Sequence, residues 1–195
     1  MRLFVAVDLD NDVRSRAIRF VEGTRGFAPE ARWARPESLH VTLKFIGEQS
    51  EARVDEIKPA LGSIEVDRFE MNFRGYGFFP TARTARVFWI GIEAGSKLTS
   101  LAATIDAKLG ELRIPPEEHS YNAHLTLARG GGRSASPHRD ESDGPNRGFQ
   151  RLQEKLAALP APEFGTMTAR EFFLYQSQLS AGGSRYTKLA TFSLR

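Results

Sequence analysis

Short apolar runs rich in β-branched and aromatic residues alternate along the chain with segments whose apolar residues recur every three or four positions. The runs predict strands and the periodic segments predict helices. The clearest helix is "GSKLTSLAATIDAKLGEL", whose apolar stripe consists of Leu98, Leu101, Ala102, Ile105 and Leu109. The predicted order is strand, helix, strand, helix, strand, strand, helix, strand, helix, strand, strand. The closing antiparallel pair is formed by "FGTMTAREFFLYQSQLS" and "SRYTKLATFSL", joined through "AGG".

Two of the predicted strands carry the same polar figure on one face. In "SLHVTLKFIG", side-chain alternation places His40 and Thr42 on one face. About half a chain later, "YNAHLTLARG" repeats the figure with His124 and Thr126. The opposite faces are apolar and consist of Leu39, Val41, Leu43 and Phe45 in the first strand, and Leu125 and Leu127 in the second. The repeat predicts a duplicated α+β arrangement of two related lobes rather than a doubly wound parallel sheet.

Composition sets limits on the class of protein. The 195 residues suit one domain or two intimately packed small lobes, and 41% hydrophobic with 26% charged residues is typical of a soluble globular chain. The absence of cysteine excludes disulfide scaffolds, thiolate metal sites and cysteine nucleophiles. No apolar run approaches the roughly 20 residues of a membrane span, and "LFVAV" is too short for a signal sequence. We therefore expect a cytoplasmic protein, whose net charge of +3 is compatible with a phosphorylated or nucleic-acid substrate.

The two figures together predict acid–base chemistry. If both polar faces share a cleft, two imidazoles and two hydroxyls converge on a small volume. Imidazole has a reference pKa of about 6.5, so one ring can act as base and its twin as acid near neutral pH. Threonine hydroxyls can hold the non-bridging oxygens of a phosphate. This set suits in-line displacement at phosphorus without a metal ion.

Four other interpretations fit less well. A metal site needs three or more ligands, whereas each strand offers a single histidine and His119 is expected on the opposite face from His124. A serine hydrolase needs a G-x-S-x-G elbow, and none occurs. Glycine-rich phosphate loops are also absent. Two coincidental surface histidines are disfavoured because the whole pattern of His, apolar residue, Thr and Leu recurs.

The residues around both figures resemble a known family. "RWARPESLHVTLKFIGE" is similar to the first signature of the 2H phosphoesterases, in particular the RNA 2′,3′-cyclic phosphodiesterases, also called 2′-5′ RNA ligases, and "HLTLAR" is similar to the second. "GFFP", "ARVFWIGIE" and "SRYTKLATFSL" resemble other segments of that family. The resemblance implies a single bilobal α+β domain over residues 1–195, with two antiparallel sheets flanking a central cleft and helices on the outer faces. It also implies metal-independent, cofactor-free hydrolysis of RNA 2′,3′-cyclic phosphates to 2′-phosphomonoesters.

Carried over residue by residue, the resemblance implies a role for each member of the two figures. His40 matches the proton donor and His124 the proton acceptor, while Thr42 and Thr126 match the phosphate-binding pair. The implied partners are RNA ends or nucleoside 2′,3′-cyclic phosphates. We also expect no membrane association and a monomeric enzyme.

Two further residues and two departures complete the expectations. Arg129 matches a basic, phosphate-binding residue of the family, although simple alternation points it away from His124. Phe45 matches an aromatic of the first signature and is expected in the core, with contact to a base as the alternative. Ala123 replaces the proline that the family commonly has before the second histidine. The segment 130–148, rich in Gly and Ser, is expected to form a long flexible loop, inert rather than a lid.

Other functions stay open on the sequence alone. Reverse 2′-5′ ligation is possible for such an enzyme. A related 2H activity on 2′-5′ linkages or small cyclic nucleotides is a second interpretation. A different class of function is an RNA-binding module without turnover, which would not need both histidines.

Overall fold

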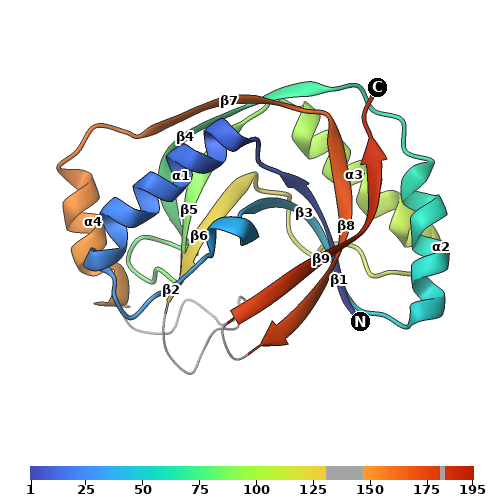
Figure 1. Cartoon of the computed structure of the whole chain (residues 1–195), viewed down its shortest axis with the longest axis horizontal. Helices are drawn as coiled ribbons and strands as arrows, with labels where there is room; N and C mark the ends of the chain where they lie inside the picture. Colours follow the sequence, from blue (N-terminus) through green and yellow to red (C-terminus); the bar gives the residue numbers. More distant parts are fainter. Residues whose placement is uncertain (131–146, 181–182) are drawn as a thin grey trace.

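The computed structural model describes residues 1–130, 147–180 and 183–195, and its strands form two antiparallel sheets (Figure 1). The first sheet has the order β3 (His40–Glu48), β1 (Arg2–Asp8), β8 (Glu171–Ser180) and β9 (Gly183–Ser193). The second has the order β2 (Arg32–Trp33), β6 (His124–Arg129), β5 (Val87–Glu93), β4 (Phe69–Phe79) and β7 (Glu163–Ala169). The predicted α+β class with two antiparallel sheets is therefore confirmed.

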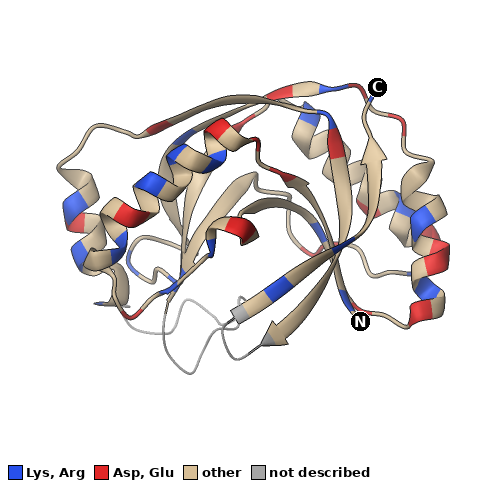
Figure 2. Ribbon diagram, viewed as in Figure 1, with Lys and Arg blue, Asp and Glu red and all other residues tan. Residues whose placement is uncertain are grey.

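Helices cover the outer side of each sheet. They are α1 (Asn11–Thr24), α2 (Glu51–Gly62), α3 (Lys97–Glu111) and α4 (Gln150–Ala157), with short 3-10 helices η1 (Arg25–Phe27), η2 (Pro36–Ser38) and η3 (Arg147–Phe149). The Asp10 side chain caps α1 by accepting a hydrogen bond from the Val13 amide at 2.8 Å, and Ser50 caps α2 in the same way. Acidic and basic residues are interspersed along these helices (Figure 2).

The chain crosses between the two sheets as it forms these layers. Helix α1 follows β1 of the first sheet but packs against β7 of the second. Helix α3 follows β5 of the second sheet but packs against β3 of the first. The main cluster of buried side chains runs through both halves, from Leu3 to Leu194. The two lobes are therefore interlocked through a shared hydrophobic core.

The closing segment differs from the prediction. "FGTMTAREFFLYQSQLS" is not one strand but two, because β7 joins the second sheet and β8 joins the first, with Arg170 between them. In the sequence, only the adjacent polar residues Arg170 and Glu171 interrupt the apolar positions at the change of sheet. The first two residues of the "AGG" connection, 181–182, and most of the predicted loop 130–148, at 131–146, lie outside the described residues, and Gly183 begins β9. The last two residues of that loop belong to η3.

A β-bulge follows the His-x-Thr figure in both site strands. In β3, Thr42 and Lys44 pair with neighbouring residues of β1, so Leu43 is the extra residue. In β6, Leu127 is the extra residue by the same pattern against β5. The bulge reverses the side-chain alternation beyond it. The expectation that Phe45 lies in the core is therefore wrong, since its side chain is 55% exposed.

The same reversal buries Lys44, which is 2% exposed. Its ammonium group lies 2.6 Å from the Asp106 carboxylate of α3 and 3.7 Å from the Glu117 carboxylate, and it donates to the Pro115 carbonyl at 2.8 Å. A buried charge needs such partners, because desolvation alone would cost several kcal/mol. Lys44 therefore ties the first site strand to α3 and to the segment that leads into the second site strand.

This contact predicts an unequal cost for two similar substitutions on α3. We expect Asp106→Asn to lower the free energy of unfolding by about 2–3 kcal/mol, because it leaves a buried ammonium with a weakened partner set. The matched control is Glu111→Gln, which removes the exposed partner of Lys108 on the same helix and should cost less than about 0.5 kcal/mol. Urea unfolding of both variants measures the difference. Equal losses would show that Lys44 does not depend on Asp106.

Candidate functional site

Strands β3 and β6 bring the two His-x-Thr figures together. The strands contact each other without sharing a ladder, since β3 is the edge of the first sheet and β6 lies within the second. The Tyr121 hydroxyl, just before β6, donates to the Thr42 carbonyl at 3.0 Å and so links the two strands. The charge of Arg129 acts on both imidazoles, which places His40 and His124 around one arginine. The predicted convergence of the two figures is therefore found in the fold.

The two histidines have the same local hydrogen bond. In each, Nδ1 lies 2.7 Å from the carbonyl oxygen two residues earlier, that of Ser38 for His40 and that of Asn122 for His124. A carbonyl oxygen can only accept, so Nδ1 carries the proton in both rings. This fixes the tautomer and leaves Nε2 of each neutral imidazole as a free acceptor. The duplicated motif thus presents two equivalent proton-transfer groups.

Aromatic rings hold each imidazole in place. The His40 ring lies 4.8 Å from the Phe4 ring and 5.1 Å from the Tyr186 ring, measured between centroids, with Tyr186 edge-on. The His124 ring lies 4.9 Å from Phe79, also edge-on, and 6.4 Å from Trp89. These neighbours restrict ring rotation and displace water. Burial accordingly lowers the pKa of both histidines from the ordinary value, and the positive charge of Arg129 lowers each further.

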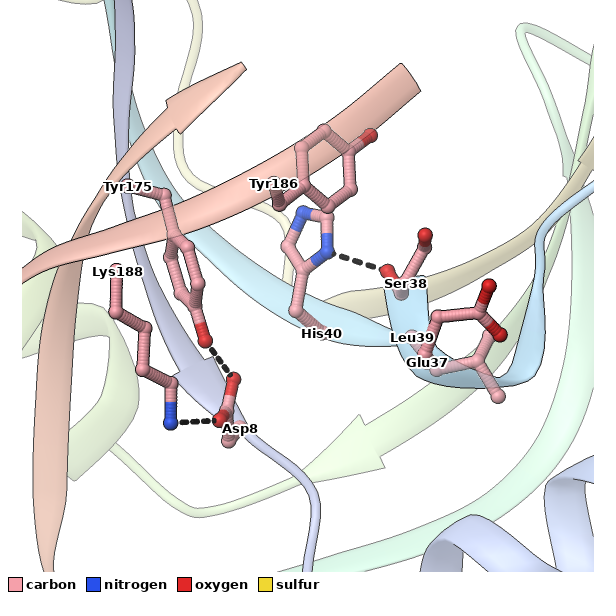
Figure 3. Close-up of a pocket in the computed structure, with 8 residues that line it drawn as sticks. All are labelled: Asp8, Glu37, Ser38, Leu39, His40, Tyr175, Tyr186 and Lys188. Carbon is pink, nitrogen blue, oxygen red and sulfur yellow. Dashed lines mark hydrogen bonds and ion pairs between the residues drawn. The ribbon is translucent and has the colours of Figure 1, made fainter. Parts of the chain in front are cut away.

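A pocket opens beside His40, and the carboxylates of Asp8 and Glu37 line it (Figure 3). Among the described residues, no carboxylate shifts the pKa of His124. Asp8 lies directly opposite His40 in the β1–β3 ladder and raises the pKa of His40 against the lowering effect of burial. Its carboxylate accepts a hydrogen bond from the Tyr175 hydroxyl and forms an ion pair with Lys188 at 2.7 Å. Burial raises the pKa of Tyr175, which keeps that hydroxyl protonated. The two histidines therefore differ in their electrostatic surroundings.

Sequence reasoning missed these pocket residues. "RLFVAVDL" reads as an entirely buried strand, because apolar residues occupy both of its faces. In the fold, one face of β1 packs in the main core, and the other contributes Phe4 and Ala6 to a smaller aromatic cluster beside His40. The signal available in the sequence was the acidic residue that ends this strand, Asp8, at the same alternation as Phe4 and Ala6.

The expected orientation of Arg129 is wrong. Simple alternation turns it away from His124, but the bulge at Leu127 reverses the pattern, and Arg129 lies where its charge reaches both histidines. The hydroxyls of Thr42 and Thr126 are not hydrogen-bonded to any other described residue. Both threonines are half-buried on the same strand faces as the histidines. The two hydroxyls and the guanidinium are therefore available to an anion.

Within residues 1–130, 147–180 and 183–195, no group of three or more His, Cys, Asp or Glu side chains could hold a metal ion. Over the same ranges, no helix is long and apolar enough to cross a membrane.

Comparison with known proteins gives one consistent family. The model for LigT-like phosphoesterases matches the chain twice, over residues 7–89 and 90–186, so each match contains one His-x-Thr figure. An RNA 2′,3′-cyclic phosphodiesterase of Archaeoglobus fulgidus is 31% identical over 192 residues, which cover 98% of this chain and 99% of that protein. The crystal structure of TT0787 of Thermus thermophilus is similar with a TM-score of 0.77 and 30% identity, covering 100% of this chain and 98% of that one. The E. coli LigT structure complexed with 3′-AMP is similar with a TM-score of 0.76 and 25% identity, covering 99% and 97%.

The packing around His124 predicts a strong effect of one added methyl group. Gly77 lies opposite Trp89 in the β4–β5 pair, and a Cβ at Gly77 would overlap the Trp89 ring. We expect Gly77→Ala to lower the free energy of unfolding by about 1–3 kcal/mol through overpacking. It should also move the imidazole NMR resonances of His124 but not those of His40, because Trp89 contacts only the former.

The control for this prediction is Gly110→Ala on α3, where a Cβ would meet no atom within 4 Å. That substitution should leave both histidine resonances unchanged and should not lower stability, since alanine favours a helix over glycine. A Gly77→Ala variant with unchanged His124 resonances would contradict the view that Trp89 fixes this imidazole.

Proposed function

This chain belongs to the LigT-like phosphoesterase family, and we propose that it hydrolyses 2′,3′-cyclic phosphates on RNA ends or nucleosides to 2′-phosphomonoesters. Relatives named RNA 2′,3′-cyclic phosphodiesterase match the chain over nearly its whole length. The chain is accordingly a phosphoric diester hydrolase, and reversal of the reaction as 2′-5′ ligation is a further possibility of the same chemistry.

The observation that carries this proposal is the matched pair of imidazoles. His40 and His124 each have Nδ1 held by a main-chain carbonyl at 2.7 Å, and both lie close to Arg129. Hydrolysis of a cyclic phosphate needs one group to remove a proton from water and another to protonate the leaving oxygen. A pair of histidines with free Nε2 atoms supplies both functions with ordinary side chains.

The proposed reaction proceeds by in-line attack at phosphorus. His124 takes a proton from water as the water oxygen forms the new bond to phosphorus. The bond from phosphorus to O3′ breaks, and His40 gives its Nε2 proton to O3′. The product has a 2′-phosphate and a free 3′-hydroxyl, and proton exchange with solvent restores both imidazoles. We propose that Thr42, Thr126 and Arg129 bind the non-bridging oxygens, whose negative charge favours the guanidinium and hydroxyl donors.

The asymmetry at Asp8 supports this assignment of roles. A general acid must be protonated while its partner base is neutral, so the pair works best when the pKa of the acid lies above that of the base. Burial lowers the pKa of both histidines. At His40 the Asp8 carboxylate raises it and the charge of Arg14 lowers it, and neither group acts on His124. The carboxylate stabilises a protonated imidazole, which favours His40 as the proton donor. Phe45 stands exposed on the strand that carries His40, a position compatible with contact to a base.

We propose that one chain is sufficient for activity, because all the named groups come from it. The expectation of a cytoplasmic monomer stays a prediction. Substitution of the histidines distinguishes the enzyme from an RNA-binding module, because a binder does not need them. The substrate that is cleaved and the product isomer distinguish it from a related 2H activity on 2′-5′ linkages.

The central test is hydrolysis of the four nucleoside 2′,3′-cyclic phosphates in excess chelator, with the product isomer identified. We expect 2′-phosphates from the wild type. Each single variant, His40→Ala or His124→Ala, should lower kcat by about 10²- to 10⁴-fold, and the double variant should be less than additive. Thr42→Ala and Thr126→Ala should cost less, about 1.5–3 kcal/mol each for one hydrogen bond to a charged oxygen.

A matched control for the histidine variants is His119→Ala, which changes a histidine outside β3 and β6. It should retain wild-type kcat. RNA binding without any turnover in the wild type would favour the binding module, and 3′-phosphate products would contradict the proposed leaving group.

The roles of the two histidines can be tested with sulfur in place of O3′. A thiolate leaving group needs little protonation, so this substrate should rescue His40→Ala far more than His124→Ala. The opposite pattern would reverse the assignment, and failure to rescue either variant would argue against acid–base roles.

The pH profile offers an independent test through Asp8. Activity should fall at high pH as His40 loses its proton and at low pH as His124 gains one. Asp8→Asn removes the charge that raises the pKa of His40, so the high-pH limb of kcat/KM should move to lower pH while the low-pH limb stays. The control is Glu37→Gln, which lines the same pocket but is not among the charges that shift either histidine. Movement of the low-pH limb in Asp8→Asn would contradict the assignment.

A further inference from the structure

Two more arginines lie beside Arg129. Arg32 of the edge strand β2 is the direct cross-strand partner of Arg129 in β6. Arg2 stands on β1 at the same alternation as Phe4 and Asp8, which face the site. Partial desolvation lowers the pKa of the exposed Arg129, Tyr186 raises it, and the charges of Arg32 and Arg2 lower it again. The three guanidinium groups therefore form a cluster that draws on both sheets.

Glu48 lies opposite Arg2 in the β1–β3 ladder, but its carboxylate forms an ion pair with the N-terminal amino group at 3.3 Å. No ion pair joins Arg2, Arg32 or Arg129 to a described carboxylate, although many other charged side chains are paired, as Lys188 is with Asp8. Like charges directly opposite each other in an antiparallel pair are destabilising. Three exposed guanidinium groups side by side, without an ion pair to a described carboxylate, suit an anion larger than one phosphate.

The chemistry of the substrate determines where such an anion would extend. A 2′,3′-cyclic phosphate closes the 3′ end of a ribonucleotide, so an RNA chain can continue from it only on the 5′ side. With Arg129 at the cyclic phosphate, the next group available to the preceding phosphodiester is Arg32. Neighbouring strands lie about 4.7–4.9 Å apart, and the long side chains of Arg32 and Arg129 can spread to contact two successive phosphates. Guanidinium suits this task because its planar donors pair with two phosphate oxygens.

We propose that Arg32, assisted by Arg2, binds the phosphodiester on the 5′ side of the cyclic phosphate, so that this enzyme prefers RNA ends to mononucleosides. This inference rests on the proposed function and adds the class of substrate to it. Arg32 and Arg2 do not act on the reacting atoms, so their contribution depends on the presence of the second phosphate.

The test compares kcat/KM for two substrates with the same terminal base, a nucleoside 2′,3′-cyclic phosphate and a diribonucleotide that ends in one. Arg32→Gln should lower the value for the diribonucleotide about ten-fold and the value for the mononucleoside less than about two-fold. Arg2→Gln should also lower kcat/KM for the diribonucleotide selectively, but by a smaller factor. The salt dependence of the diribonucleotide reaction should also weaken, by about 0.7 in log–log slope for one lost phosphate contact on a single strand.

Two controls separate this role from a general loss of charge or of structure. Arg19→Gln removes an equal charge from the exposed surface of α1 and should affect neither substrate. Arg32→Gln should unfold at the same or a slightly higher urea concentration than the wild type, because it relieves repulsion with Arg129. A purely structural role would instead lower stability and both activities together.

The outcomes distinguish this inference from the proposed function. Normal mononucleoside turnover in the wild type, with equal losses on both substrates in Arg32→Gln or with no loss on either, overturns the second phosphate site alone. Absence of mononucleoside and diribonucleotide turnover in the wild type overturns the proposed function and this inference with it.

Discussion

In both β3 and β6, one extra residue interrupts the ladder directly after the His-x-Thr figure, Leu43 in the first strand and Leu127 in the second. Because a strand alternates its side chains, a single extra residue exchanges the two faces for everything beyond it. Without the bulges, Phe45 and Arg129 would point into the core. The position of the phosphate-binding arginine therefore depends on one backbone irregularity that occurs twice.

The residue that follows the bulge differs between the two site strands. The first has Lys44 there, and the second has Ala128, and both side chains are buried. A small apolar residue fits a core without further support, whereas the lysine requires Asp106, the more distant Glu117 and a main-chain carbonyl. The duplication has thus kept the backbone geometry of the site. It has added in one half an ionic contact that ties the first site strand to a helix and to the approach to the second.

Electrostatics also distinguishes the two halves of the site. Burial and the charge of Arg129 favour the neutral form of both imidazoles. The Asp8 carboxylate favours the protonated form, and it does so for His40 alone. An arriving phosphate would offset the charge of Arg129 and favour protonation of a nearby imidazole. Two histidines in nearly identical hydrogen-bonded settings can therefore take different roles, because Asp8 and Arg14 act on His40 but not on His124.

The sequence by itself determined the α+β class, the duplication and the four residues of the His-x-Thr figures, since alternation and repetition are local properties of the chain. It also located the buried stripe of α3, because helical periodicity is local in the same way. It did not determine the bulges, the change of sheet at Arg170 or the environment of Asp8, because each depends on which strand lies alongside. Pairing partners are set by contacts between residues distant in the chain, such as Asp8 with Lys188 or Arg32 with Arg129. Only the tertiary structure decided which face of each strand Phe45 and Arg129 occupy, because register is a property of a pair of strands and not of one.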